Sequence, residues 1–159
     1  MKYIEYARME RDEACFICRA VESQDPDRDL VLHRSGLTVV LMNKYPYNTG
    51  HLLVAPARHV PDLSALSREE ICELGLMVRR SIEMLRRALS PDGFNIGINL
   101  GKVAGAGLEA HLHVHVVPRW LGDTNFMPVI SNTKVIPEAL NDTYMKLKKY
   151  ADYLRKNDD

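Results

Sequence analysis

The chain has 159 residues, 46% of them hydrophobic, and its 21 basic and 21 acidic side chains give a formal net charge of zero. This length suits a single domain over 1–159, and the balanced charge excludes general electrostatic binding along a nucleic acid polymer. Because the apolar runs are shorter than the roughly 18 residues of a membrane span and the charged N-terminus lacks the apolar core of a signal peptide, we expect a cytoplasmic protein without a membrane partner.

The first predicted elements are strands. Residues 30–42 should form a hairpin around the RSG segment at 34–36, because the valines on both sides of it favour strands. The loop KYPYNTG then leads to a short apolar strand over 51–56, which Pro56 ends.

A long amphipathic helix follows over about 67–89. Ser67 and Glu70 have the spacing of a capping box, and apolar residues recur behind them at intervals of three and four. The segment SPDG stops this helix, since proline and glycine do not continue it.

Two more strands and a second helix complete the domain. We expect a strand over 94–101, a glycine-bearing loop, and a strand over 111–118 that Pro118 closes. Pro137 should open the C-terminal helix, whose apolar face is formed by Leu140, Tyr144, Leu147, Ala151 and Leu154. The predicted fold class is α+β, with a mostly antiparallel sheet, a central long helix and a C-terminal helix.

Histidines alternate with apolar residues in the segment HLHVHVV, 111–117. Side chains alternate between the two faces of a strand, so His111, His113 and His115 should share one face while the apolar residues between them pack against the helices. Imidazole can act as nucleophile, base or hydrogen-bond donor near neutral pH, which suits phosphoryl transfer. Two other interpretations are histidines that are merely polar surface residues and a simple three-histidine metal site.

Cysteine spacing points to a second site. Cys15 and Cys18 form a C-x-x-C pair, and Cys72 lies apart from them. In a reducing compartment this spacing indicates metal or redox chemistry rather than a structural disulfide. The spacing alone leaves three interpretations: a small buried pair in a helix turn, a redox dithiol, and half of a zinc site.

HLHVHVV matches the histidine-triad motif H-φ-H-φ-H-φ-φ, where φ is an apolar residue. Other segments fall in the family's order: CFIC, MNKYPYNTGHLLVAPARH and NLGKVAGAG. From about Cys15 to Arg119 the chain therefore resembles the histidine triad (HIT) superfamily. The resemblance implies a HIT-like fold in one domain, with an N-terminal zinc-knuckle segment over about 1–29, a triad core over about 30–119 and a C-terminal extension over about 120–159. It also implies a homodimer or a higher homo-oligomer.

The resemblance implies roles for particular polar residues. His113 would be the nucleophile that attacks an α-phosphate and becomes nucleotidylated, His115 would donate a hydrogen bond to the phosphate, and His51 would belong to the same cluster. Asn43 would contact a ribose hydroxyl, and Asn99 resembles the family's asparagine on the phosphate side.

The glycine-rich loop departs from the family's pattern. Many relatives carry Gln or Ser four residues before the first histidine of the triad, where this chain has Gly107. Backbone N–H groups around Gly105 and Gly107 are candidates to bind phosphate instead, although a glycine-rich loop is more often only a turn.

The resemblance also implies a complete metal site. Zinc-containing members of the family complete the C-x-x-C pair with the histidine of a PxxH segment and with the first triad histidine. The ligands here would be Cys15, Cys18, His59 and His111. Four protein ligands leave no position for water, so this zinc would be structural rather than catalytic.

Beyond the triad, VVPRWLGDTNFMPVI and TKVIP are similar to the bacterial diadenosine tetraphosphate phosphorylase group of the superfamily. This likeness implies a nucleotide substrate, cleavage of dinucleoside polyphosphates through a nucleotidyl-histidine, and phosphate or water as the acceptor. Arg119 would meet the polyphosphate, and Trp120 would stack on a purine or pack in an interface.

Three other functions remain open. They are a nucleoside phosphoramidate hydrolase, a hexose-1-phosphate uridylyltransferase and a nucleotide-binding regulatory module without turnover. The second is disfavoured, because uridylyltransferases usually carry glutamine in place of the third histidine and this chain has His115.

Overall fold

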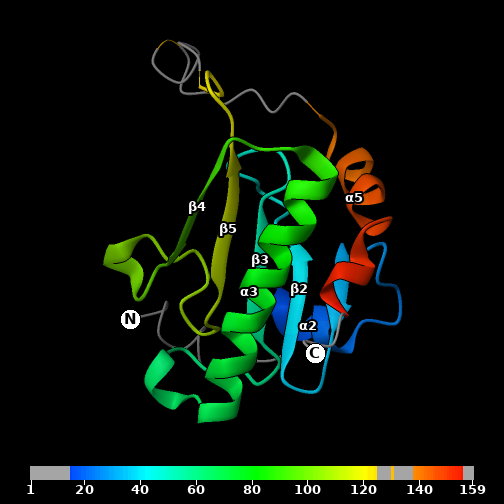
Figure 1. Cartoon of the computed structure of the whole chain (residues 1–159). Coiled ribbons are helices and arrows are strands. Elements are labelled where there is room, and N and C mark those ends of the chain that lie inside the picture. The colour runs from blue at the N-terminus through cyan, green and yellow to red at the C-terminus, as the bar shows by residue number, and fades with distance from the viewer. Residues whose placement is uncertain (1–14, 125–129, 131–137, 156–159) are drawn as a thin grey trace.

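The computed structural model of the protein describes residues 15–124, 130 and 138–155. One five-stranded antiparallel sheet forms its centre, with strand order β1-β2-β3-β5-β4 (Figure 1). The strands are β1 Val31–Arg34, β2 Thr38–Met42, β3 Leu52–Pro56, β4 Gly93–Ile98 and β5 Val114–Arg119. The predicted hairpin is present as β1 and β2, and the apolar strand after it is present as β3.

Helices cover both faces of the sheet. The long helix α3, Arg68–Leu89, crosses one face, and the short helix α2, Phe16–Glu22, lies behind the other (Figure 1). Helix α5, Leu140–Lys148, packs beside α3. Short 3-10 turns lie at Leu63–Ala65, Lys102–Ala104 and Ala151–Leu154. The α+β expectation is confirmed, and among the described residues no helix is both long and apolar enough to cross a membrane.

Two hydrophobic clusters show how strand alternation positions the site. Leu52 and Val54 of β3 pack with α3, together with Leu112, Val114 and Val116. Leu53 and Ala55 face the opposite side and pack with α2. The odd-numbered residues of β3 and β5 therefore point away from α3, and this face carries the histidines.

The predicted strand over 111–118 is wrong at both ends. Strand β5 begins at Val114, because Leu112 N–H donates to the carbonyl of Val60, which lies beyond the end of β3. Strand β5 also continues through Pro118, which pairs with Phe94. Proline is tolerated there because β3 does not extend that far along β5, so its missing N–H removes no ladder bond.

The C-terminal helix differs from its prediction. Pro137 lies outside the described residues, α5 ends at Lys148, and Ala151–Leu154 form a 3-10 turn. The predicted buried face is nevertheless largely right, since Tyr144, Leu147 and Leu154 are buried. The Leu154 carbonyl, at the end of this turn, accepts a hydrogen bond from Arg80 of α3 at 3.3 Å.

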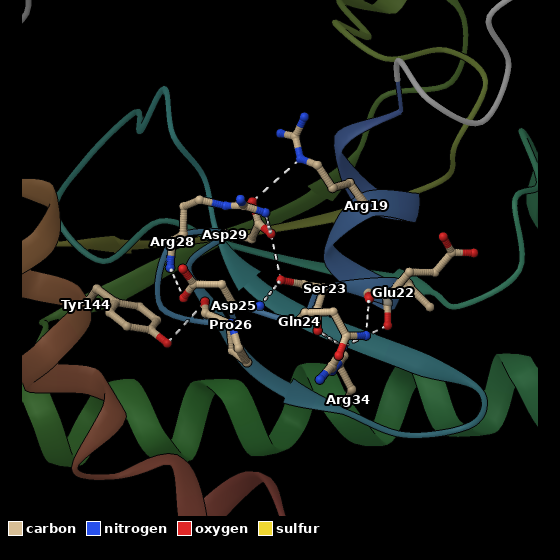
Figure 2. A network of polar contacts seen from close by, with 11 residues as sticks. Arg19, Glu22, Ser23, Gln24, Asp25, Pro26, Arg28, Asp29, Arg34 and Tyr144 are labelled. Carbon is tan, nitrogen blue, oxygen red and sulfur yellow. Dashed lines mark hydrogen bonds and ion pairs between the residues drawn. The ribbon is translucent and has the colours of Figure 1, made fainter.

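A polar network ties the segment after α2 to the core (Figure 2). The buried carboxylate of Asp29 accepts hydrogen bonds from Ser23 at 2.6 Å and Arg28 at 3.1 Å, and pairs with Arg19 of α2 at 3.5 Å. The Tyr144 hydroxyl of α5 lies 2.9 Å from both the Asp27 carboxylate and the Val31 carbonyl, so its proton is donated between these two acceptors. The short helix is thus held by charge-assisted bonds as well as by packing.

The predicted capping box at the start of α3 is present. Ser67 and Glu70 exchange side-chain and backbone hydrogen bonds, and the Arg58 guanidinium donates to both Glu70 oxygens at 2.9 and 2.8 Å. Arg58 and then the Ser67 backbone lower the pKa of Glu70 to about 2. This carboxylate therefore holds the loop that carries His59 against α3.

We expect this pair to stabilise the fold in a pH-dependent way. A carboxyl whose folded pKa is depressed contributes stability that is present above its ordinary pKa and is lost as pH falls toward the folded pKa. Wild-type protein should unfold at higher urea than Glu70→Gln at pH 6, and the difference should shrink from pH 4.5 toward pH 2. Glu69→Gln, the same change at an exposed neighbour, is the control. An equal effect of both variants at pH 6 would contradict the assignment.

Candidate functional site

The histidine cluster is formed by neighbouring strands at the face away from α3. His115 of β5 is the register partner of Leu53 in β3 and of Gly97 in β4. His51, immediately before β3, is fully buried, and its ring lies 5.1 Å from that of His115. The structure therefore brings His51 and His115 together, as the resemblance implied.

Hydrogen bonds define the tautomers of these two rings. The N–H of Tyr47 donates to Nδ1 of His51 at 3.0 Å, so the proton of the neutral His51 ring lies on Nε2. That Nε2 is 2.9 Å from Nδ1 of His115 and donates to it. Neutral His115 therefore carries its own proton on Nε2, where it is a hydrogen-bond donor.

Burial keeps His115 neutral. Burial, followed by the neighbouring His113, lowers the pKa of His115 to about 4. At pH 7 this ring offers an N–H dipole rather than a full positive charge. Its exposed fraction is 9%. A neutral donor of this kind suits an oxygen that gains negative charge.

His113 has the opposite tautomer. Its Nδ1 lies 2.8 Å from the carbonyl oxygen of His111, and because a carbonyl only accepts, Nδ1 carries the proton of the neutral ring. The lone pair then resides on Nε2. The ring lies edge-on to His115 with centroids 4.9 Å apart and has an exposed fraction of 7%. One face of the sheet thus holds a ring with a basic nitrogen beside a ring with an N–H donor.

The four proposed metal ligands also lie together. The ligand atoms of Cys15, Cys18, His59 and His111 are all within 4.8 Å of one another. Cys15 caps the start of α2, and its sulfur accepts from the Cys18 N–H. The cluster joins α2 to the loop after β3 and to the start of the triad, and it could hold a metal ion.

Distances and tautomers fit a tetrahedral metal. Nδ1 of His111 is 3.3 and 3.5 Å from the two sulfurs, and Nδ1 of His59 is 3.1 Å from Cys18 Sγ. Zinc bonds of about 2.3 Å to sulfur and 2.0 Å to nitrogen predict roughly 3.5 Å between such ligands. His111 Nε2 donates to the Pro56 carbonyl at 2.8 Å, which leaves its lone pair on Nδ1. Burial lowers the pKa of His111 to about 4 and favours this neutral form.

Asn43 lies at the histidine cluster. Its Oδ1 accepts from the Tyr45 N–H at 2.9 Å, and its Nδ2 is 3.4 Å from His51 Nδ1. Asn43 N–H also bonds the carbonyl of His51, which closes the loop between β2 and β3. The amide is thus oriented beside the histidines.

Asn99 and the glycines form an exposed loop after β4. The predicted strand over 94–101 ends early at Ile98, and positive φ angles of 78° at Gly101 and 87° at Gly105 turn the chain. Asn99 Nδ2 lies 3.5 Å from the Gly105 carbonyl. The N–H of Gly105 donates to the Lys102 carbonyl, so it already has an acceptor in this arrangement. Space around Gly107 is open.

Arg119 and Trp120 lie farther along β5. Arg119 shares the histidine face, roughly 13 Å along the strand from His115. Its guanidinium makes two bonds to Asp123, at 2.6 and 2.8 Å, and one to Asn95 at 2.6 Å, and it lowers the pKa of Asp123 well below the ordinary range. Trp120 is half-buried and lines a cavity of about 430 Å³ beside Leu89, at the end of α3. The structure does not bring these two residues into contact with the triad.

Sequence reasoning missed Tyr47. KYPYNTG was predicted to be a loop and belongs to one of the segments that resemble the family, but no role followed for Tyr47, whose ring stacks on His115 and touches His51. The only available signal was an aromatic residue close before His51. Stacking across a loop depends on tertiary contacts that no spacing rule encodes.

Comparison with known proteins supports this geometry. The HIT domain family model matches residues 12–120. An AP-4-A phosphorylase of Mycobacterium tuberculosis is 41% identical over 148 residues, 90% of this chain and 76% of that protein. A bis(5'-adenosyl)-triphosphatase of Dictyostelium discoideum is 33% identical over 119 residues, 75% of this chain and 78% of that protein. The crystal structure of a Zn-bound histidine triad family protein from Mycobacterium smegmatis superposes with a TM-score of 0.71 at 26% identity, covering 91% and 97% of the two chains.

The family model covers both the C-x-x-C pair and the triad, and the phosphorylase aligns with 90% of the chain. The fold and the triad motif agree with this match. The chain therefore belongs to the HIT domain family and is an enzyme of that family.

Proposed function

We propose that this enzyme cleaves dinucleoside polyphosphates, with diadenosine tetraphosphate as the first substrate to test. His113 Nε2 attacks an α-phosphorus, a P–N bond forms, and the bond from that phosphorus to the bridging oxygen breaks. The distal nucleotide leaves with the bonding electrons. From diadenosine tetraphosphate the leaving group is ATP, and an adenylyl group stays on His113.

The observation that carries this proposal is the opposite protonation of two adjacent rings. The Nδ1–H of His113 is held by the carbonyl of His111, so Nε2 carries the lone pair that nucleophilic attack requires. His115 receives a hydrogen bond on Nδ1 and therefore presents Nε2–H to an oxygen on the same phosphorus. The relatives named above for polyphosphate cleavage support the same substrate class.

A second acceptor completes the cycle. Inorganic phosphate attacks the adenylyl-histidine to give ADP, or water attacks it to give AMP, and either step returns the electron pair of the P–N bond to Nε2. Of the two, we propose phosphate, because the phosphorylase shares more of its sequence with this chain than the triphosphatase does. Asn43 would orient a ribose, since it lies against His51 beside the attacking ring.

We further propose zinc at the four-ligand cluster. Two cysteine sulfurs and two imidazole nitrogens are the donors that zinc prefers, and the related zinc-bound structure supports this metal. All four positions are taken by protein, so the metal would hold the chain around the triad rather than activate water.

Product analysis tests the proposed function. Purified protein is mixed with diadenosine tetraphosphate with and without phosphate, and nucleotides are resolved by anion-exchange chromatography. We expect ADP and ATP with phosphate. Formation of AMP and ATP both with and without phosphate would show that the acceptor is water and that the enzyme is a hydrolase. Absence of any product would refute polyphosphate cleavage. The protein would then be tested with an adenosine phosphoramidate as substrate: cleavage would indicate a phosphoramidate hydrolase, and no cleavage would indicate a binding module.

A further inference from the structure

We infer that Tyr47 is a positioning residue, whose ring and backbone hold His115 in the orientation that makes it a donor to the phosphate. This inference rests on the proposed function, since it concerns the same reaction. Tyr47 lies in the loop between β2 and β3, outside the triad motif. Its effect on substrate would pass through His51 and His115.

Tyr47 contacts both histidines by two different groups. Its ring is nearly parallel to that of His115, with centroids 5.5 Å apart and planes at 14°, and lies 4.5 Å from that of His51. Its backbone N–H donates to His51 Nδ1 at 3.0 Å. The N–H favours the tautomer of His51 and, through it, that of His115, while the ring restricts how His115 can rotate and keeps water from competing for the His51–His115 hydrogen bond. Alanine at position 47 keeps the N–H and loses the ring, so averaging of the His115 tautomer in that variant reports the ring alone.

The loop that carries Tyr47 is itself anchored. The buried amide of Asn48 donates to the Pro118 carbonyl at 3.2 Å and to Asp123 at 2.7 Å. Gly50 has φ of +75°, and an added Cβ would lie 2.5 Å from a methyl of Leu89. Asp123 is held in turn by Arg119. A loop anchored at these points can fix a side chain more closely than a free loop can.

Burial explains why a ring is needed at this position. His51 has no exposed surface and His115 is 9% exposed, while Tyr47 is 49% exposed. One face of Tyr47 therefore packs on the histidines and the other meets solvent. A hydrogen bond between two neutral rings is weak in water, so a cover that excludes water strengthens it. Tyr45 of the same loop is 85% exposed, which makes it a matched control.

The test compares Tyr47→Ala, Tyr47→Phe and Tyr45→Ala in the full-length, zinc-loaded protein. Long-range proton–nitrogen NMR at pH 7 reads the tautomer of each histidine without substrate. We expect His115 as pure Nε2–H in wild type, Tyr47→Phe and Tyr45→Ala, and averaged nitrogen shifts in Tyr47→Ala. Cleavage of diadenosine tetraphosphate should show kcat lowered by about 10- to 100-fold in Tyr47→Ala, with KM nearly unchanged.

Two results would overturn the inference: an unchanged His115 tautomer in Tyr47→Ala, or a raised KM with normal kcat, which indicates direct substrate contact instead. If Tyr47→Ala does not fold, Tyr47→Leu keeps the bulk without the stacking and takes its place. Inactivity of the wild type with any polyphosphate would refute the proposed function alone, because the NMR result then decides separately whether Tyr47 orders His115.

Discussion

Replacing His113 with alanine should lower kcat for diadenosine tetraphosphate by at least about 10⁴-fold, because no other group would form the covalent bond to phosphorus. The nucleotidyl adduct should also disappear from the intact-protein mass spectrum after acid quench. His113 is buried but lies beside the proposed metal ligands rather than in the main apolar core, so we expect the variant to fold. Circular dichroism and zinc content, measured alongside, show whether it does.

A histidine away from the site provides the control for this substitution. His33 is partly buried in β1, which is separated from β5 by β2 and β3. His33→Ala should keep its adduct and stay within about threefold of wild-type kcat, the range of a change that touches no reacting group. If the nucleotidyl adduct persists in His113→Ala, another residue must be the nucleophile and the proposed mechanism is wrong.

Removing one cysteine of the cluster should cost the metal and much of the stability. Cys15→Ser leaves three ligands, and serine binds zinc poorly, so bound zinc should fall from about one per chain to a small fraction. A loss of several kcal/mol corresponds to a fall in Tm of about 10 °C for a domain of this size. Atomic absorption measures the zinc, and calorimetry measures the transition.

Cys72 supplies the matched control, because it is exposed on α3 and lies apart from the cluster. Cys72→Ser should retain full zinc and the wild-type Tm. A zinc-loaded and equally stable Cys15→Ser protein would refute the ligand set. Cys15→Ser molecules that remain folded should keep measurable activity, since the metal is not proposed to touch substrate.

The proposed metal site also explains why the triad histidines would have two different roles. His111 points its Nδ1 at the sulfurs, while its carbonyl orients His113. One residue therefore joins the proposed structural site to the proposed nucleophile. Loss of zinc should loosen His111, which gives a physical route from the metal to the orientation of His113.

Local patterns predicted several features correctly. The capping box at Ser67 and Glu70 and the spacing of apolar residues identified α3, because a helix start and an amphipathic face are encoded within a few residues. The alternation of histidine and apolar residues in HLHVHVV correctly predicted that the histidine side chains point away from the main apolar core. It did so even though regular pairing starts only at Val114, because an extended chain alternates with or without a partner strand.

Other features depended on neighbours that are distant in the chain. No spacing rule indicates that Pro118 lies within β5, since this depends on where β3 ends, or that Asp123 accepts a hydrogen bond from Asn48, which lies 75 residues earlier in the chain. The tautomers of His51, His113 and His115 are decided by a Tyr47 amide and a His111 carbonyl.

By itself, then, the sequence determined the type of fold, the face of the sheet that carries imidazole and the four residues able to bind a metal, because these follow from short-range periodicity and from a family motif. Only the tertiary structure decided which nitrogen of each ring holds a proton and which aromatic ring covers the pair. Which ring nitrogen carries the proton depends on the donor or acceptor that lies within about 3 Å of it, and only folding brings these partners together.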